Sequence, residues 1–171
     1  ANHIIVSTAY ISKKTEPRFN YYKHLYDRVI DTGPHPLHET LRHYNFLSEL
    51  TGRDIKPQPP HIPWRQVPSP IQQSPYVVIN FGSNEPGRRW PFERFLDIAK
   101  RIVNRGYTVV FIGGPKEKAQ SAEIAEKLPH PNVIDYILKT DLPGVLDVVQ
   151  SAHAMLTTET GPGHFGLALG R

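Results

Sequence analysis

The residues best suited to chemistry lie between Thr157 and His164, where hydroxyl groups, a carboxylate, glycines and an imidazole follow one another as TTETGPGH. The mostly apolar residues 152–156 precede this stretch and the small-residue segment 165–169 follows it, which is the order of a strand, a tight turn and the start of a helix. A helix start carries unpaired backbone N–H groups and a partial positive charge, so this turn can hold a phosphate, to which His164 could donate. A capped helix with a surface histidine and no ligand gives the same pattern, and both interpretations stay open.

A second polar loop, residues 82–90, follows the apolar run Tyr76–Phe81. Its letters GSNEPGRR are similar to a phosphate loop of the G-x₄-G-K-[ST] type, but Arg88 replaces the lysine and Arg89 replaces the hydroxyl residue that would hold magnesium. These two differences argue against an ATPase. Backbone donors and guanidinium groups still suit a diphosphate, because an arginine guanidinium can donate two parallel hydrogen bonds to phosphate oxygens. Two solvated surface arginines are the simpler alternative.

A third loop, Gly113–Glu117, follows the apolar run Tyr107–Ile112. It lacks the G-x-G-x-x-G spacing, so the sequence gives little support to a nicotinamide site. In nucleotide-binding folds a carboxylate just after the second strand commonly holds the ribose hydroxyls, which makes Glu117 a candidate for that role. Glu117 can equally do no more than complement the dipole of the helix that it opens.

Metal and covalent chemistry find little support. Among the nine histidines, His38 and His43 lie five positions apart on an expected helix and face different ways, and no H-E-x-x-H stretch occurs. No nucleophile elbow and no Ser–His–Asp order is visible, and cysteine is absent. We therefore expect no bound metal and no covalent catalyst.

The elements that must position these loops alternate regularly after residue 75. Strands are expected at 76–81, 107–112, 132–136 and 153–157, and helices at 91–105, 116–128 and 142–150, the last one capped by Asp141. Such alternation predicts an α/β fold, a Rossmann-like parallel sheet with flanking helices and right-handed crossovers. Ligands bind such sheets at the carboxyl ends of the strands, where all three loops are expected to meet.

The first part of the chain is less regular. We expect a strand at 4–9 and a helix at 36–50 with its inward apolar residues at Leu37, Leu41, Tyr44 and Leu47 or Leu50. Seven prolines between positions 57 and 75 favour an extended connection. The predicted domains are therefore a remnant of an amino-terminal domain at 1–55, a proline-rich linker at 56–75 and a binding domain at 76–171, with both ends cut.

Composition narrows the class of partner. The formal net charge of +4 favours anionic ligands, but the basic residues are scattered, which argues against nucleic acid. No apolar stretch approaches the roughly 20 residues of a membrane span, and no signal-like start is present. A cytoplasmic protein is the expectation.

Residues Tyr76 to Gly170 resemble the nucleotide-sugar domain of glycosyltransferase family 9, the family of the ADP-heptose:lipopolysaccharide heptosyltransferases. Three stretches carry the resemblance. Gly82-Ser83 with the later RRWP is similar to P-G-S…K-R-W-P, and GGPKE is similar to a glycine-rich turn that ends in glutamate. The stretch TETGPGH and the residues after it are similar to N-D-[ST]-G-x-x-H-x-A-A-A-L-G. Before residue 56 the resemblance is limited to His38-Glu39 and Arg42.

The resemblance implies a GT-B architecture of two Rossmann-like domains and a reaction that inverts the anomeric centre without a metal or other cofactor. It places Arg88 where a lysine neutralises the leaving phosphates, and Glu159 where an aspartate meets the sugar or the nearby backbone. Arginine keeps the charge but changes the reach, and glutamate lengthens the carboxylate. The resemblance further implies that Ser83 and Asn84 bind the diphosphate and that Glu117 binds the ribose. It also implies that the phosphate cradle at the helix start is formed by Thr160, Gly161 and His164.

The resemblance also implies the function. We expect a glycosyltransferase that moves a sugar, heptose first of all, from an ADP-sugar to a lipopolysaccharide-type, lipid-linked or other glycan acceptor. The reaction would take place at the cytoplasmic face of the inner membrane, with peripheral contact to it. The family's general base lies in the early amino-terminal domain, so we expect the 171-residue chain alone not to catalyse the sugar transfer. The alternatives are a non-catalytic nucleotide- or nucleotide-sugar-binding module on the same fold, and a plain interaction domain with structural glycine turns.

Overall fold

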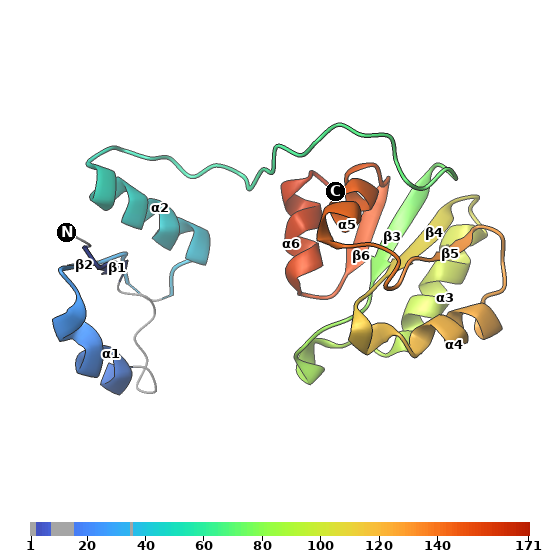
Figure 1. The fold of residues 1–171 in the computed structure, drawn as a ribbon, viewed down its shortest axis with the longest axis horizontal. Coiled ribbons are helices and arrows are strands. Elements are labelled where there is room, and N and C mark those ends of the chain that lie inside the picture. The colour runs from blue at the N-terminus through green and yellow to red at the C-terminus, as the bar shows by residue number, and fades with distance from the viewer. Residues whose placement is uncertain (1–2, 8–15, 35) are drawn as a thin grey trace. The chain divides into compact units, whose positions relative to one another are not determined.

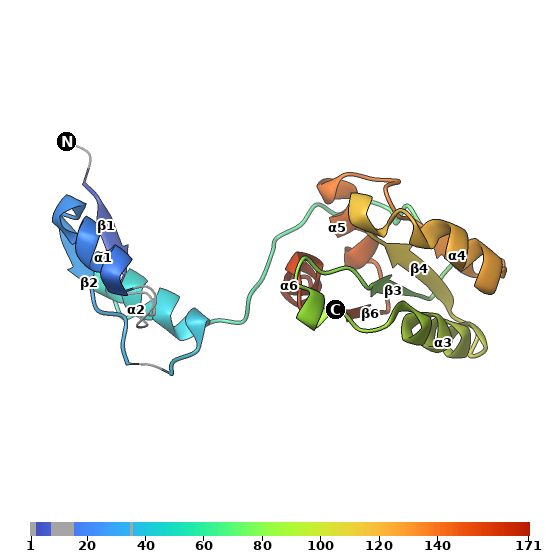
Figure 2. The same cartoon turned by 90° about the horizontal axis from the view of Figure 1, so that it is seen from below.

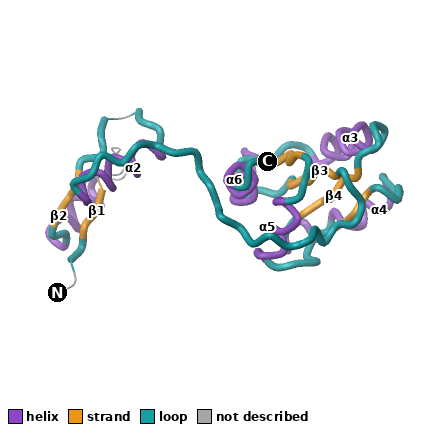
Figure 3. Tube along the Cα trace, turned by 90° about the horizontal axis from the view of Figure 1, so that it is seen from above, coloured by secondary structure: helices purple, strands orange, loops and turns teal. Residues whose placement is uncertain are grey.

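A computed structural model describes residues 3–7, 16–34 and 36–171. The chain divides into two compact units, Ala1–Pro59 and Pro60–Arg171 (Figure 1). Figure 3 shows loop throughout the segment between the last helix of the first unit and the first strand of the second. Each unit is described by itself.

The C-terminal unit is built on a parallel sheet with the strand order β5-β4-β3-β6. Its central strands β3 (Tyr76–Asn80) and β4 (Thr108–Ile112) are buried along their whole length, as the continuous apolar runs predict. The flanking strands are β5 (Val133–Asp135) and β6 (Ala154–Thr157). The α/β fold with a parallel sheet is thus confirmed, and the carboxyl ends of β3, β4 and β6 lie along one edge.

Helices cover both faces of this sheet. The helices α3 (Phe92–Val103) and α4 (Gln120–Lys127) pack on one face and share a core with Ile79 and Phe111. The helix α5 (Leu142–Gln150) packs on the other face, and α6 (Gly161–Ala168) contacts both α5 and β6. In Figure 2, α5 and α6 lie to the left of the strands and α3 and α4 to the right.

Local signals fix most of these helix boundaries. In α3 the residues at helical spacing, Phe95, Leu96, Ala99 and Val103, are buried, and Asp141 accepts a hydrogen bond from the Gly144 N–H at the start of α5, as expected. The helix expected at 116–128 is wrong at its start. Pro115–Glu117 forms a separate 3₁₀ turn, η3, because the Glu117 carboxylate accepts the Gly114 N–H (3.0 Å) and closes the turn on itself.

The N-terminal unit contains a pair of parallel strands, β1 (Ile5–Ser7) and β2 (Arg28–Ile30). Between them α1 (Glu16–Tyr22) leads into the 3₁₀ turn η1 (Lys23–Leu25), and α2 (Glu39–Thr51) follows them. The sequence did not predict α1 or β2. The strand β2 is only three residues long, so it gives no alternation to detect.

The inward face predicted for α2 is largely wrong. Leu41, Leu47 and Leu50 are 37–41% exposed, while Leu37 and Tyr44 are only half-buried. The buried residue of α2 is Arg42, which is 4% exposed. The observed inward face of α2 differs from the predicted one because two polar side chains of the helix contact the segment after β2. Arg42 donates to Thr32 Oγ1 (3.4 Å) and to the Pro34 carbonyl (3.5 Å), and Asn45 donates to the Thr32 carbonyl (3.0 Å).

The second half of the proline-rich segment is fastened to the C-terminal unit, so that unit begins before the expected residue 76. Trp64 Nε1 donates to Asp147 Oδ1 (2.8 Å), and the Arg65 guanidinium contacts both oxygens of the same carboxylate. The Arg65 hydrogen bond holds the pKa of Asp147 below its ordinary value. Ile71 lies in the core beside Tyr76, and the Ile62 N–H donates to the Ala168 carbonyl. We call residues 62–71 the strap.

Helices of membrane-spanning length and apolarity are absent from the part of the chain that the structure describes.

Candidate functional site

The loops after β3 and β6 are joined by side-chain hydrogen bonds. Asn80, the last residue of β3, donates through Nδ2 to Thr157 Oγ1 (3.1 Å) and to Thr160 Oγ1 (3.0 Å). Thr158 Oγ1 donates to the Gly82 carbonyl (2.5 Å). Asn80 and Thr158 are both buried, so these bonds are shielded from water. These hydrogen bonds therefore hold residues 157–160 against the carboxyl end of β3.

The helix start expected in this stretch is present, and α6 begins within it, at Gly161, with Thr160 as the residue before it. The Thr160 side chain does not cap this helix start, since its hydroxyl accepts a hydrogen bond from Asn80 instead. Gly163 permits the close approach of the turn to β6, since a Cβ there would lie 2.9 Å from Thr157 Cγ2. The strand, turn and helix start inferred from the sequence are thus present, with the positive end of a helix dipole at the edge of the sheet.

The loop after β4 is closed by Glu117. Its carboxylate lies against the loop after β3, since a Cβ at Gly82 would come within 2.5 Å of Glu117 Oε1. A Cβ at Gly113 would come within 2.8 Å of Glu117 Cβ. Both glycines therefore make room for this one side chain. The glutamate holds its own 3₁₀ turn and fills the space between two loops, and its role toward a ribose stays a prediction.

The three loops meet around a cavity of about 390 Å³, a size that small-molecule sites commonly have. We call it the three-loop cavity. It brings together five of the predicted contacts, namely Ser83, Asn84, Glu117, Thr160 and Gly161. The other residues around it are Asn80, Gly82, Gly114, Pro115, Lys116 and Pro162.

The structure does not bring Arg88, Glu159 and His164 into this cavity. Arg88 Nε lies 3.5 Å from Glu159 Oε2, and these side chains are 51% and 70% exposed. His164 is exposed on the first turn of α6. Arg88 and Glu159 therefore face each other beside the cavity, an arrangement that the sequence did not suggest.

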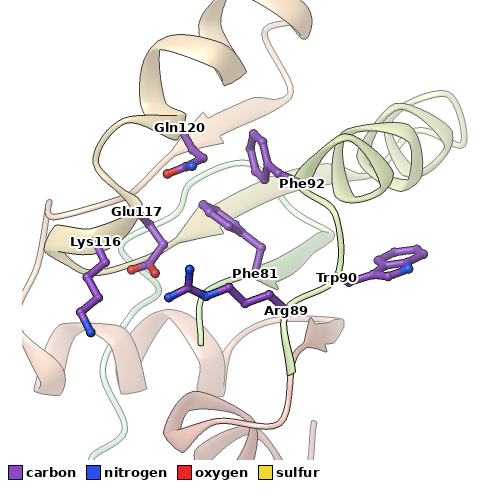
Figure 4. A pocket seen from close by; sticks show the side chains of 8 residues that line it. Phe81, Arg89, Trp90, Phe92, Lys116, Glu117 and Gln120 are labelled. Atoms are coloured by element: carbon purple, nitrogen blue, oxygen red, sulfur yellow. The ribbon is translucent and has the colours of Figure 1, made fainter. Parts of the chain in front are cut away.

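A second cavity of about 450 Å³ lies next to the first and shares Gly82, Lys116 and Glu117 with it. Its remaining lining is mainly aromatic and basic: Phe81, Arg89, Trp90, Phe92 and Gln120 (Figure 4). We call it the aromatic cavity. The Phe81 and Phe92 rings are 4.5 Å apart at their centroids, and Gln120 Oε1 is buried without a hydrogen-bond partner among the described residues.

Sequence reasoning missed Lys116 and Gln120. Lys116 stands beside Glu117 in the glycine-rich turn, and its charge next to a candidate phosphate site was a usable signal. Gln120 gave none, because it is one polar residue in an ordinary helical stretch. No group of three or more histidine, aspartate or glutamate side chains positioned to hold a metal occurs among residues 3–7, 16–34 and 36–171.

The family model described as glycosyltransferase family 9 (heptosyltransferase) matches residues 13–171, which is most of the chain. The chain belongs to glycosyltransferase family 9. The resemblance carried by the three loops is thereby confirmed, and it extends over most of the N-terminal unit as well.

Curated relatives of this family 9 chain include lipooligosaccharide heptosyltransferase 2 of Haemophilus influenzae, 27% identical over 89 residues, and lipopolysaccharide heptosyltransferase 1 of Pseudomonas aeruginosa, 28% identical over 97 residues. The matches cover 50% and 56% of this chain but only 26% of each relative. The matched part of the chain thus spans only about a quarter of the length of these curated relatives.

Solved structures show the same fold. A family 9 glycosyltransferase from Veillonella parvula superposes with a TM-score of 0.73 at 21% identity, covering 88% of this chain and 46% of that one. ADP-heptose lps heptosyltransferase II of E. coli gives 0.58 at 25% identity, with 68% and 40% covered. The E. coli heptosyltransferase WaaC with ADP gives 0.66 at 19% identity, with 88% and 48% covered. These neighbours are GT-B type glycosyltransferases, in agreement with the expected architecture.

Proposed function

We propose that this chain carries the donor-binding part of a glycosyltransferase that moves heptose from an ADP-sugar to a lipopolysaccharide-type or other glycan acceptor. Membership of family 9 supports this, and so do the names of the curated relatives, which are heptosyltransferases. The fold neighbour WaaC was solved with ADP and with ADP-2-deoxy-2-fluoro heptose.

The three-loop cavity is the observation that carries the proposal. It places the start of α6, which the Thr160 side chain does not cap, beside the hydroxyl and amide groups of Ser83 and Asn84. Backbone N–H groups at a helix start and neutral polar side chains are the usual partners of phosphate oxygens. A diphosphate is the part of an ADP-sugar that such a cavity suits.

We assign the other roles by the family pattern. Glu117 would hold the ribose through the oxygen that is not bonded to the Gly114 N–H. Arg88 would stabilise the departing phosphates after leaving Glu159, and Glu159 would then meet the sugar or the backbone beside it. His164, on the first turn of α6, would donate to a phosphate oxygen. In this proposal the reaction inverts the anomeric centre and uses no metal or other cofactor.

The proposed setting is the cytoplasmic face of the inner membrane, with peripheral contact to it and a lipid-linked acceptor. Nucleic acid is not a proposed partner. The general base would come from a part of the family's amino-terminal domain that lies outside these 171 residues. The chain by itself should then bind ADP without releasing it from ADP-heptose.

A glycine at the cavity offers a sharp test of donor binding. A Cβ at Gly161 would meet no atom within 4 Å, so Gly161→Leu should leave the fold intact while filling space at the cavity. Isothermal titration should show ADP binding weakened about tenfold or more, a loss of at least about 1.4 kcal/mol. Gly87→Leu is the matched control, because Gly87 also has open space around it and lines neither cavity. Absence of ADP binding by the unmodified chain would contradict the proposal.

Turnover is tested separately with ADP-heptose and a lipopolysaccharide-type acceptor, in EDTA and in Mg²⁺. Release of ADP by this chain alone would show that the base is not missing. Release that depends on Mg²⁺ would overturn the proposed metal independence.

A further inference from the structure

Lys116 reaches across the gap between two of the site loops. It belongs to η3 after β4, and its Nζ donates to Asn84 Oδ1 in the loop after β3 at 2.9 Å. In Figure 4 the Lys116 chain extends away from Phe81 and Phe92, so its amine is not directed at the aromatic part of the neighbouring cavity. The ammonium group therefore lies at the polar side of the three-loop cavity, which Lys116 and Asn84 both line.

The two arginines that the sequence offered are engaged elsewhere. Arg88 lies beside Glu159 and lines neither cavity. Arg89 lines the aromatic cavity and donates through Nε to the Ser83 carbonyl at 2.8 Å. Among the described residues that line the three-loop cavity, Lys116 is the only one with a full positive charge.

A diphosphate in this cavity needs such a charge. The start of α6 supplies a partial positive charge of about one half, and the carboxylate of Glu117 opposes an anion. A lysine ammonium has three donors, and one bond to Asn84 leaves two for other acceptors. Asn84 holds the amine over the cavity, which reduces the side-chain entropy that a free surface lysine would lose on binding.

We propose that Lys116 Nζ binds a phosphate oxygen of the diphosphate in the three-loop cavity, and that Asn84 positions it there. This assignment rests on the proposed function, since it specifies how the donor is held. It adds a cationic contact from the loop after β4 to the contact that the family pattern assigns to Arg88 in the loop after β3.

The test compares Lys116→Met with Lys118→Met in isothermal titrations of the 171-residue chain with ADP, pyrophosphate and adenosine. Lys118 is an exposed lysine two positions further on that lines neither cavity, so it is the matched control. Lys116→Met should weaken the binding of ADP and of pyrophosphate about tenfold or more and leave the binding of adenosine unchanged. The reason is that only ligands with a phosphate group form the charge-assisted bond that the variant loses. Lys118→Met should bind all three as the unmodified chain does.

Two further variants show how the charge acts. Asn84→Ala should weaken ADP binding by a smaller factor than Lys116→Met, and its effect should be smaller in the Lys116→Met background, since the part of its role that acts through the amine is then already lost. Lys116→Arg should recover part of the ADP affinity. The ADP affinity of the unmodified chain should fall more steeply with added salt than that of Lys116→Met.

The possible failures are distinguishable. If the unmodified chain binds ADP and Lys116→Met binds it equally well, the assignment of Lys116 is wrong and the proposed function stands. If Arg88→Met abolishes ADP binding while Lys116→Met does not, the cation is Arg88, as the family pattern implies. If the unmodified chain binds neither ADP nor pyrophosphate, the proposed function and the assignment both fail.

Discussion

In the C-terminal unit every residue of β3 and β4 is buried, whereas in the N-terminal unit three leucines of α2 are more than a third exposed and an arginine is buried in their place. The C-terminal unit has an apolar core on each face of its sheet. The N-terminal unit has a polar contact between α2 and the segment after β2. Within these 171 residues, apolar spacing coincides with a buried core in the unit built on the four-stranded sheet and not in the unit with the two-stranded one.

The largest effect should come from the core of the C-terminal unit. Phe111→Ala removes a fully buried ring between α3 and the sheet, and should lower the free energy of unfolding by about 3–5 kcal/mol. Urea denaturation followed by circular dichroism measures this. A loss below about 1 kcal/mol would mean that the two units do not differ as their burial indicates.

Arg42→Ala should have the next largest effect, and it should be confined to the N-terminal unit. Arg42 is buried and donates to Thr32 and Pro34, and its removal breaks both of these hydrogen bonds, at a cost of about 1–3 kcal/mol. Hydrogen exchange should become faster in β2 and α2 and stay unchanged in β3 and β4. Faster exchange in all of these elements would show that the two units unfold together.

Asp147 should make the C-terminal unit sensitive to acid. Since Arg65 lowers the pKa of Asp147 in the folded chain, the carboxylate stabilises the fold at pH values above its ordinary pKa of 3.8. That contribution is lost as the pH falls through the lowered value. Asp147→Asn should cost about 1–2 kcal/mol at neutral pH and remove this part of the acid dependence. Identical stability curves against pH for the two proteins would refute the role given to the strap.

Leu47→Ala should have the smallest effect, below about 0.5 kcal/mol, because the side chain is already 41% exposed. Thermal unfolding in parallel with Phe111→Ala provides the comparison. A loss of 2 kcal/mol or more would restore the inward face that the sequence predicts for α2.

Local patterns in the sequence predicted much of the C-terminal unit. The runs before Gly82 and Gly113 are buried strands, and the turn at Thr157–His164 leads into α6 as its composition indicates. These predictions succeed because burial, turn chemistry and helix starts are properties of neighbouring residues. They also placed five site residues around one cavity, since loops after parallel strands meet at one edge of the sheet.

Side-chain pairing between distant segments could not be predicted in this way. The contact of Lys116 with Asn84 spans 32 positions, and that of Arg88 with Glu159 joins the loops after β3 and β6. The strap is a further case, since nothing near Trp64 indicates that its indole will meet Asp147. Proline content predicted an extended connection at residues 57–75, and the structure has neither helix nor strand there, but such a segment can lie on a domain as readily as it can connect two.

The strap has a practical consequence for anyone who wishes to produce the donor-binding half by itself. A gene fragment that begins at Tyr76 would remove Ile71 from the hydrophobic cluster that contains Val148. It would also leave the Asp147 carboxylate without the Arg65 guanidinium. The recombinant product would then expose apolar surface next to an unpaired charge, a combination that promotes aggregation during purification. Starting the reading frame at Pro60 avoids this, since it keeps every residue that ties the strap to α5 and α6.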